Sequence, residues 1–216
     1  FCCEDTEAAL IPERSADVMV NGDFVLTGEK SFAARYSDVD ETKWFYEYVK
    51  FVVENGLYYD INDSTFRPNE DTTRATMVYA LWSAAERPEP KGESPFTDVS
   101  GDEWHASAVV WASENGIVLG YDDDTFRPEV TVSREQIAAL IHRYTVYLGR
   151  DDSARAELDA FGDAGEVASW FTEDFRWAVA DGIFIGNDEG MLEPKKTATR
   201  AEVATILKRV IEKAPR

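Results

Sequence analysis

The chain has 216 residues and a formal net charge of −20, with 42 acidic and 22 basic side chains. This excess of negative charge repels nucleic-acid phosphate and anionic lipid, so nucleic-acid binding is disfavoured. The content of 44% hydrophobic and 12% aromatic residues predicts a folded protein rather than a disordered one. No apolar run approaches the roughly 20 residues that a membrane-spanning helix needs, so membrane insertion is not expected.

Residues 1–35 precede the regular part of the chain. Residues 17–27 surround an Asn21-Gly22 pair, which favours a tight turn, so we expect a small β-hairpin there. This flank could be the end of a preceding segment or an arm packed on the first repeat. Cys2 and Cys3 are adjacent, a spacing at which cysteines rarely bridge each other, so we predict a fold without disulfides.

Three tryptophans mark a tandem repeat. In each copy a tryptophan is followed by a glycine after 12 residues, a proline after 24 and an arginine after 30: Trp44, Gly56, Pro68 and Arg74; Trp104, Gly116, Pro128 and Arg134; Trp170, Gly182, Pro194 and Arg200. We place the repeats at 36–87, 96–149 and 161–213. A repeat of this size cannot bury its apolar face alone, so the three are predicted to form one domain.

Each repeat is predicted to open with an amphipathic helix of about three turns. The expected apolar faces are Trp44, Tyr48, Phe51 and Val52; Trp104, Ala108, Trp111 and Ala112; and Trp170, Trp177 and Ala178 beside Phe175. We expect the tryptophans to be core residues, Trp111 and Trp177 above all. The helices are predicted to end at the glycines in the left-handed conformation. A short apolar step, which could form a strand, and an acidic turn follow.

A second helix is predicted to begin at Thr73, Ser133 and Thr199. Ser133 with Gln136, and Thr199 with Glu202, fit a capping box, in which the hydroxyl caps the helix and the third residue caps back. The expected apolar positions lie three, four, seven and eleven residues after the arginine. The fold class is therefore mainly α, with two helices and a connecting loop per repeat.

The arginine at the first position of this second helix is not explained by helix formation. A cation is unfavourable there, because the helix dipole is positive at its N-terminus. One explanation is an ion pair with the preceding acidic turn, through Asp71 or Glu129 for example. The other is an anion site, formed by exposed backbone N–H groups and the guanidinium. The residues alone leave both open.

Other candidate sites are weak. The turn at 122–124 and the loop at 60–64 faintly resemble calcium loops, but neither has the required glycine, so we predict turns and no metal site. His105 and His142 lie in different elements and form no zinc or triad pattern, and His142 is expected on a helix surface. We therefore predict neither a cofactor nor catalytic activity.

The repeats resemble a known family. The segments Phe96-Thr97-Asp98-Val99, Asn115 to Pro128 and Ser133-Arg134-Glu135 are similar to the S-layer homology repeat, and the likeness extends from Tyr36 to Lys213. The resemblance implies a pseudo-threefold spindle with a central bundle of one helix per repeat. It also implies a non-covalent anchor at the bacterial cell surface, in the cell wall or S-layer. In this family, grooves between repeats bind secondary cell-wall polysaccharide, typically a terminal pyruvylated N-acetylmannosamine.

The resemblance also implies the site residues. The family's ligand-contacting arginine matches Arg74, Arg134 and Arg200, and the further candidates are Thr73, Ser133, Thr199, Gly120 and Gly186. The two glycines would let the backbone approach a sugar closely. The first repeat has Tyr59-Asp60 where the others have Leu119-Gly120 and Ile185-Gly186. We therefore expect unequal grooves, with Arg74 contributing least.

Two alternatives remain open at this point. The strongly acidic surface would suit modified peptidoglycan, in a cationic, amine-bearing form, better than an acidic polymer. The repeats could also pair with other protein subunits in a surface lattice.

Overall fold

The computed structural model describes residues 18–20, 23–25, 32–61 and 64–213, and this part of the chain is mainly helical, as predicted. Its helices are α1 (Phe32–Arg35), α2 (Tyr46–Glu54), α3 (Arg74–Ala84), α4 (Ala106–Glu114), α5 (Arg134–Tyr147), α6 (Thr172–Ala180) and α7 (Arg200–Ile211), with 3-10 turns η1 (Ala164–Glu166) and η2 (Ser169–Phe171). Strands β1 (Val18–Val20) and β2 (Asp23–Val25) pair antiparallel within the predicted hairpin. Its Asn21-Gly22 turn and the two cysteines lie outside the described residues.

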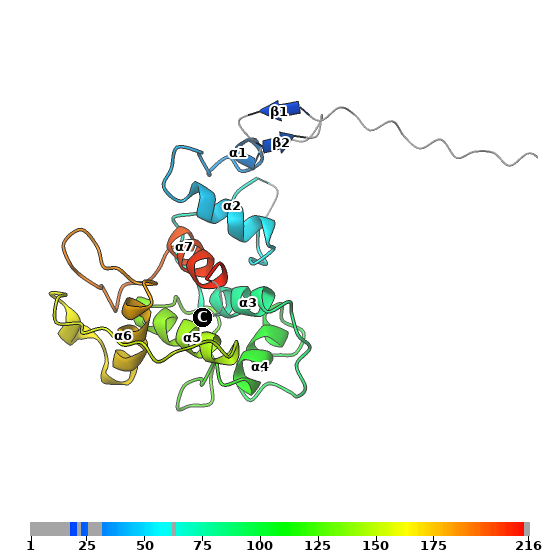
Figure 1. Cartoon of the computed structure of the whole chain (residues 1–216). Helices are drawn as coiled ribbons and strands as arrows, with labels where there is room; N and C mark the ends of the chain where they lie inside the picture. Colours follow the sequence, from blue (N-terminus) through cyan, green and yellow to red (C-terminus); the bar gives the residue numbers. More distant parts are fainter. Residues whose placement is uncertain (1–17, 21–22, 26–31, 62–63, 214–216) are drawn as a thin grey trace, which may run out of the picture.

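The helices pack in pairs that cross the repeat boundaries. The second helices α3, α5 and α7 lie near the middle of the molecule, and α2, α4 and α6 lie outside them (Figure 1). Each first helix packs on the second helix of the preceding repeat, so that α4 lies on α3, α6 on α5 and α2 on α7. The last of these contacts joins the two ends of the repeat array, and the three repeats therefore close into a ring.

Short backbone contacts around the centre follow the same cyclic order. The N–H of Thr72 donates to the carbonyl of Ala198, that of Ala198 to Val132, and that of Val132 to Thr72, at 2.9, 3.3 and 2.9 Å. One residue before the cap of each second helix therefore bonds to its counterpart in another repeat. This arrangement supports the expected pseudo-threefold spindle, and it aligns the starts of the three central helices.

The second helices agree with the sequence in both packing and capping. The predicted positions Met77, Val78, Leu81, Ile137, Ala138, Ile141, Val203, Ala204 and Leu207 are fully buried. Ser133 and Thr199 form complete capping boxes, and Thr73 accepts a hydrogen bond from the Thr76 amide. Gly56, Gly116 and Gly182 end the first helices with φ between 61° and 70°, as predicted. The caps and the glycines therefore act within a few residues, whereas the burial of the apolar positions depends on packing of helices from different repeats.

The predicted burial of the repeat-marking tryptophans is wrong for two copies. Trp44 is 61% exposed and Trp170 is 74% exposed, whereas Trp111 and Trp177 are buried as predicted. The first helices begin after the marking tryptophan, so it does not continue their apolar face. In α2 the buried positions are Val49 and Val52, preceded by Phe45, rather than the face that includes Trp44.

The expected exposure of His142 is also wrong. Its ring is buried and stacks on Trp177, with ring centroids 4.6 Å apart. Nδ1 of His142 lies 2.7 Å from a carboxylate oxygen of Asp174. Because α6 covers this face of α5, a polar position on an isolated helix becomes an internal contact between repeats.

Candidate ligand-binding grooves

The three arginines each reach into the loop of the following repeat. The Nε of Arg74 donates to the Phe126 carbonyl, that of Arg134 to Leu192 and that of Arg200 to Phe66, at 2.8, 2.7 and 2.8 Å. The loop after each first helix thus meets an arginine from another repeat. We name the resulting sites groove A (58–60, Arg200, Trp104), groove B (118–120, Arg74, Trp170) and groove C (184–186, Arg134, Trp44).

An aspartate fixes the loop that receives each arginine. Both carboxylate oxygens of Asp98 accept hydrogen bonds from backbone N–H groups, of Phe126 and of Arg127, each at 2.7 Å. Asp38 and Asp163 make the same pair of bonds in their repeats. The second donor has φ near 60° in each copy, a left-handed conformation that a non-glycine residue adopts at a cost. The aspartate stabilises that conformation and so positions the carbonyl that binds the arginine.

Arg74 and Arg134 are cations in a desolvated setting. The guanidinium of Arg74 lies 4.8 Å from the ring centres of Tyr121 and Phe126, and that of Arg134 lies 4.8 Å from the Phe184 ring. Burial lowers the pKa of both arginines. Among the described residues, neither arginine forms an ion pair, with the preceding acidic turn or elsewhere. Carboxylates act on both from a longer range, Asp98 on Arg74 and chiefly Glu202 on Arg134. Because none of them is in direct contact, an anion from outside can form the close ion pair that each guanidinium lacks.

The backbone half of the expected anion site is absent. The N–H groups of Arg74 and Ala75 donate to the carbonyls of Val130 and Pro128, at 2.9 and 3.0 Å. The N–H groups at the starts of α5 and α7 are bonded to the neighbouring repeat in the same way. These amides therefore cannot hold an anion while the repeats are docked, and recognition of a negative charge falls to the guanidinium groups.

Groove B is the larger of the two open grooves. It encloses about 600 Å³, and its lining includes Arg74, Gly120, Gln136, Arg143 and Trp170. Leu119 stands 69% exposed along its length. An exposed indole and an exposed aliphatic side chain thus border a groove of mixed charge, in which Arg74 and Arg143 lie with Asp122 and Glu135.

Groove C encloses about 200 Å³ and repeats this composition. Its lining includes Arg134, Ile185, Gly186, Arg209 and Trp44. Ile185 is 67% exposed, like its counterpart in groove B. The two grooves therefore offer one kind of surface, with a guanidinium beside an exposed tryptophan.

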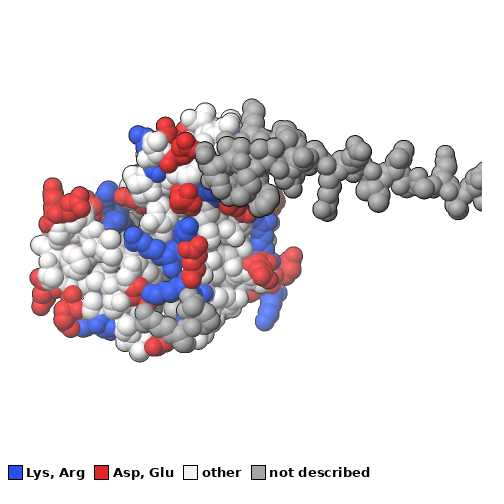
Figure 2. Space-filling view, turned by 45° about the horizontal axis from the view of Figure 1, so that its top comes forward, with Lys and Arg blue, Asp and Glu red and all other residues white. Residues whose placement is uncertain are grey.

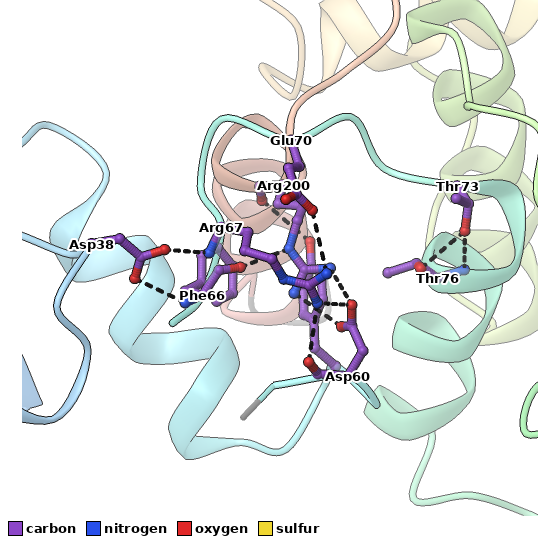
Figure 3. A network of polar contacts seen from close by, with 9 residues as sticks. Asp38, Asp60, Phe66, Arg67, Glu70, Thr73, Thr76 and Arg200 are labelled. Carbon is purple, nitrogen blue, oxygen red and sulfur yellow. Dashed lines mark hydrogen bonds and ion pairs between the residues drawn. The ribbon is translucent and has the colours of Figure 1, made fainter. Parts of the chain in front are cut away.

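Groove A is occupied by its own side chains. Asp60 carboxylate oxygens lie 3.0 and 3.1 Å from the guanidinium nitrogens of Arg200, and Asp60 also pairs with Arg67 (Figure 3). Tyr59 stacks on Trp104, with ring centroids 4.8 Å apart and planes 9° apart. The expectation that Asp60 weakens the site of Arg74 assumes that both lie in one groove. This assumption is wrong, because the loop that carries Asp60 contacts Arg200.

The secondary candidates have structural roles. The hydroxyls of Thr73, Ser133 and Thr199 accept the amide hydrogen bonds that cap the second helices. Gly120 and Gly186 do line grooves B and C, at φ of 74° and 75°. A Cβ at Gly120 would lie 2.3 Å from the Phe96 ring, and one at Gly186 would lie 2.8 Å from Phe161. Packing of these rings is therefore enough to require glycine at both positions.

The family model of the S-layer homology domain matches residues 35–78, 95–138 and 160–204, which together are more than half of the chain. The chain belongs to the S-layer homology family. The three matched segments begin within one residue of the predicted starts of the repeats and contain all three arginines.

Relatives of this S-layer homology chain include surface proteins and enzymes. An endoglucanase of Bacillus sp. (strain KSM-635) is 28% identical over 85% of this chain and 19% of its own length. The surface-layer 125 kDa protein of Lysinibacillus sphaericus is 28% identical over 83% of this chain and 15% of its own. A cellulosome-anchoring protein of Acetivibrio thermocellus is 26% identical over 69% and 34%. The chain thus spans about a third or less of these relatives.

The family match and these relatives place the S-layer homology chain at the cell surface. Within the part that the structure describes, no helix is long and apolar enough to cross a membrane. The described residues also contain no group of three or more His, Cys, Asp or Glu that could hold a metal ion. On the face drawn in Figure 2, Lys and Arg side chains gather near the centre with Asp and Glu among them, so an acidic chain still presents local basic surface.

Four residues that line the S-layer homology grooves are not among the residues predicted for the site. Trp44 and Trp170, which the helical spacing places in the core, instead line grooves C and B. Arg143 and Arg209 line the same two grooves, each nine residues after the arginine that starts its helix. The sequence does carry a signal for this second arginine, since the same position holds arginine in two repeats. In the first repeat it holds Ser83.

Proposed function

We propose that this chain anchors a bacterial surface protein by binding secondary cell-wall polysaccharide, through a pyruvylated sugar, in grooves B and C. The observation that carries the proposal is that Arg74 and Arg134 are desolvated and make no direct ion pair among the described residues, and that each lines the same groove as an exposed tryptophan. An anionic saccharide offers a carboxylate to the arginine and an apolar ring face to the tryptophan.

The chemistry of the pyruvate ketal suits these arginines. Its carboxylate stays ionised at neutral pH, and a guanidinium offers it N–H donors in a fixed plane, whereas lysine offers a point charge. The Nε of each arginine is already committed to a loop carbonyl, which holds the guanidinium in one orientation. This constraint lowers the entropy cost of binding, since the side chain is ordered before the ligand arrives.

The variety of the relatives supports an anchoring role without catalysis by this module. The matched region covers 19% of the endoglucanase and 15% of the surface-layer protein. A segment shared by proteins with such different names fits an attachment function better than a shared reaction. We therefore propose that the module binds the cell wall and has no catalytic activity of its own.

A cell-wall pull-down tests this function. Purified walls are incubated with the chain before and after chemical extraction of the secondary polysaccharide, and the bound fraction is measured. We expect binding to be lost after extraction and to be inhibited by a pyruvylated N-acetylmannosamine saccharide, but not by the same saccharide without its ketal. Undiminished binding to extracted walls contradicts the polysaccharide proposal and favours modified peptidoglycan. Concentration-dependent self-association without wall binding favours a lattice role.

A further inference from the structure

We propose that groove A is a closed third site, in which Asp60 takes the place of the ligand's acidic group and Tyr59 takes the place of its sugar ring. The chain then binds two saccharides, in grooves B and C, rather than three. The inference rests on the proposed function and deepens it, because it names what decides the number of sites.

The three grooves share the same arginine contacts, so their residues can be compared at equivalent positions of the repeats. Each arginine donates through Nε to a loop carbonyl of the next repeat, at 2.7–2.8 Å. Each also lies about 5 Å or less from an aromatic ring centre of that repeat. Arg200 is therefore presented to groove A as its counterparts are presented to grooves B and C.

The charge of Arg200 is neutralised inside the molecule. The carboxylate of Asp60 approaches both terminal nitrogens of Arg200, at 3.0 and 3.1 Å. The same carboxylate pairs with Arg67, which in turn pairs with Glu70 at 3.3 Å (Figure 3). The carboxylate of Asp60 thus takes the place beside the guanidinium where an acidic ligand would pair, and glycine occupies the position in the other two repeats. A ligand entering groove A would have to displace a pre-formed ion pair.

The aromatic side of the groove is occupied as well. Trp44 and Trp170 stand 61% and 74% exposed beside grooves C and B, whereas Trp104 is only partly exposed. Trp104 is covered by Tyr59, which stacks parallel to it, and by Tyr79, whose ring centroid lies 5.6 Å away. The positions equivalent to Tyr59 in the other repeats hold Leu119 and Ile185, which have no ring to stack on a tryptophan. Asp60 thus accounts for the neutralised charge and Tyr59 for the parallel stack, while Tyr79 covers Trp104 from a second side.

The first experiment is equilibrium dialysis with a labelled pyruvylated N-acetylmannosamine saccharide at saturating concentration. We expect two saccharides per wild-type chain and three per chain of the variant Y59L/D60G, which carries the residues of the second repeat. The third site should be weaker than the other two by about 10-fold at most, because groove A keeps Arg200 and lacks only a second arginine, at the position of Ser83. Adding R200A to the variant should return the number to two.

The second experiment isolates groove A. In R74A/R134A, which lacks the key arginines of grooves B and C, we expect saccharide binding to be lost, and Y59L/D60G in that background should restore one site. Thermal melts identify any variant that fails to fold, and Y59L/D60A, which keeps a Cβ at position 60 but offers no acceptor to Arg200, then replaces Y59L/D60G. Three sites in the wild-type chain, or no gained site in the folded variants, would overturn the inference. An absence of binding by the wild-type chain would instead refute the proposed function, and the inference with it.

Discussion

At the scale of single residues, the arginines of the repeats differ in partner although they are identical in sequence position. All three sit at the first position of a second helix and bond to a loop carbonyl. Only Arg200 has a carboxylate within ion-pair distance among the described residues. Its role in stability and the role of the other two in binding can therefore be separated by substitution.

Arg74→Ala or Arg134→Ala should each remove one saccharide site, because each deletes the counter-ion of the ligand's carboxylate. The loss is expected to be about 1.5–3 kcal/mol of binding free energy at that site, roughly 10- to 100-fold in affinity. Calorimetric titration with the pyruvylated saccharide measures both the number of sites and their affinity. Arg74→Lys is the matched control, which keeps the charge and loses the planar fork.

Arg200→Ala should leave the number of saccharide sites at two and lower the stability of the fold. The substitution removes the bond to the Phe66 carbonyl and leaves Asp60 with Arg67 as its remaining cation. Chemical denaturation alongside the same titration separates the two effects. Loss of a saccharide site in this variant, with stability unchanged, would contradict the closed state of groove A.

Asp98→Ala should destabilise the chain by about 2–4 kcal/mol, because the carboxylate accepts two backbone hydrogen bonds and supports the left-handed Arg127. Urea unfolding followed by tryptophan fluorescence measures the change. The exposed Glu129→Ala is the matched control, with an expected change below about 0.5 kcal/mol. Equal effects of the two substitutions would show that the loop does not depend on its aspartate.

At the scale of helices, the second helix of each repeat carries its own start signal. Ser133 accepts from the Gln136 amide, and the Gln136 side chain accepts from the Ser133 amide in return. The same helix start is bonded to the third repeat through the amides of Arg134 and Glu135. Local capping and docking of repeats therefore depend on the same turn.

Ser133→Ala should lower the free energy of unfolding by about 1 kcal/mol, because the amide of Gln136 loses its acceptor. Ser133→Gly should cost only a few tenths of a kcal/mol, since glycine is tolerated at a helix cap. Thermal and urea unfolding of both variants give the comparison. An alanine variant as stable as the glycine variant would mean that neighbouring carbonyls, rather than the cap, hold this helix start.

At the scale of the whole molecule, the ring of helix pairs predicts a single cooperative unit. Every first helix has its main partner in the preceding repeat, and α2 has its partner in the last. No repeat can therefore be removed without leaving helices from two others unpaired.

Deleting residues 96–149 should abolish cooperative unfolding, because α3 loses α4 and α6 loses α5. The intact chain is the control, and its transitions by far-ultraviolet circular dichroism and by tryptophan fluorescence should coincide. Two separately folded fragments that each melt cooperatively would contradict the closed ring.

Much of this protein is determined by local sequence. The 3.6-residue spacing of Met77, Val78 and Leu81 and its copies, the cap hydroxyls and the left-handed glycines each act within a few residues, so helix positions and repeat starts could be derived without a structure. The repeated arginine, out of place at a helix N-terminus, marked the candidate site for the same reason.

The tertiary structure alone decided which parts of the repeats meet. Because helices and loops pack on neighbouring repeats, Arg200 rather than Arg74 lies beside Asp60, and Trp44 and Trp170 are exposed at the grooves. The docked neighbour also takes the helix N–H groups that could have held an anion. No repeat contains these facts in its own sequence, because contacts between residues 140 positions apart depend on how three similar units close around one axis.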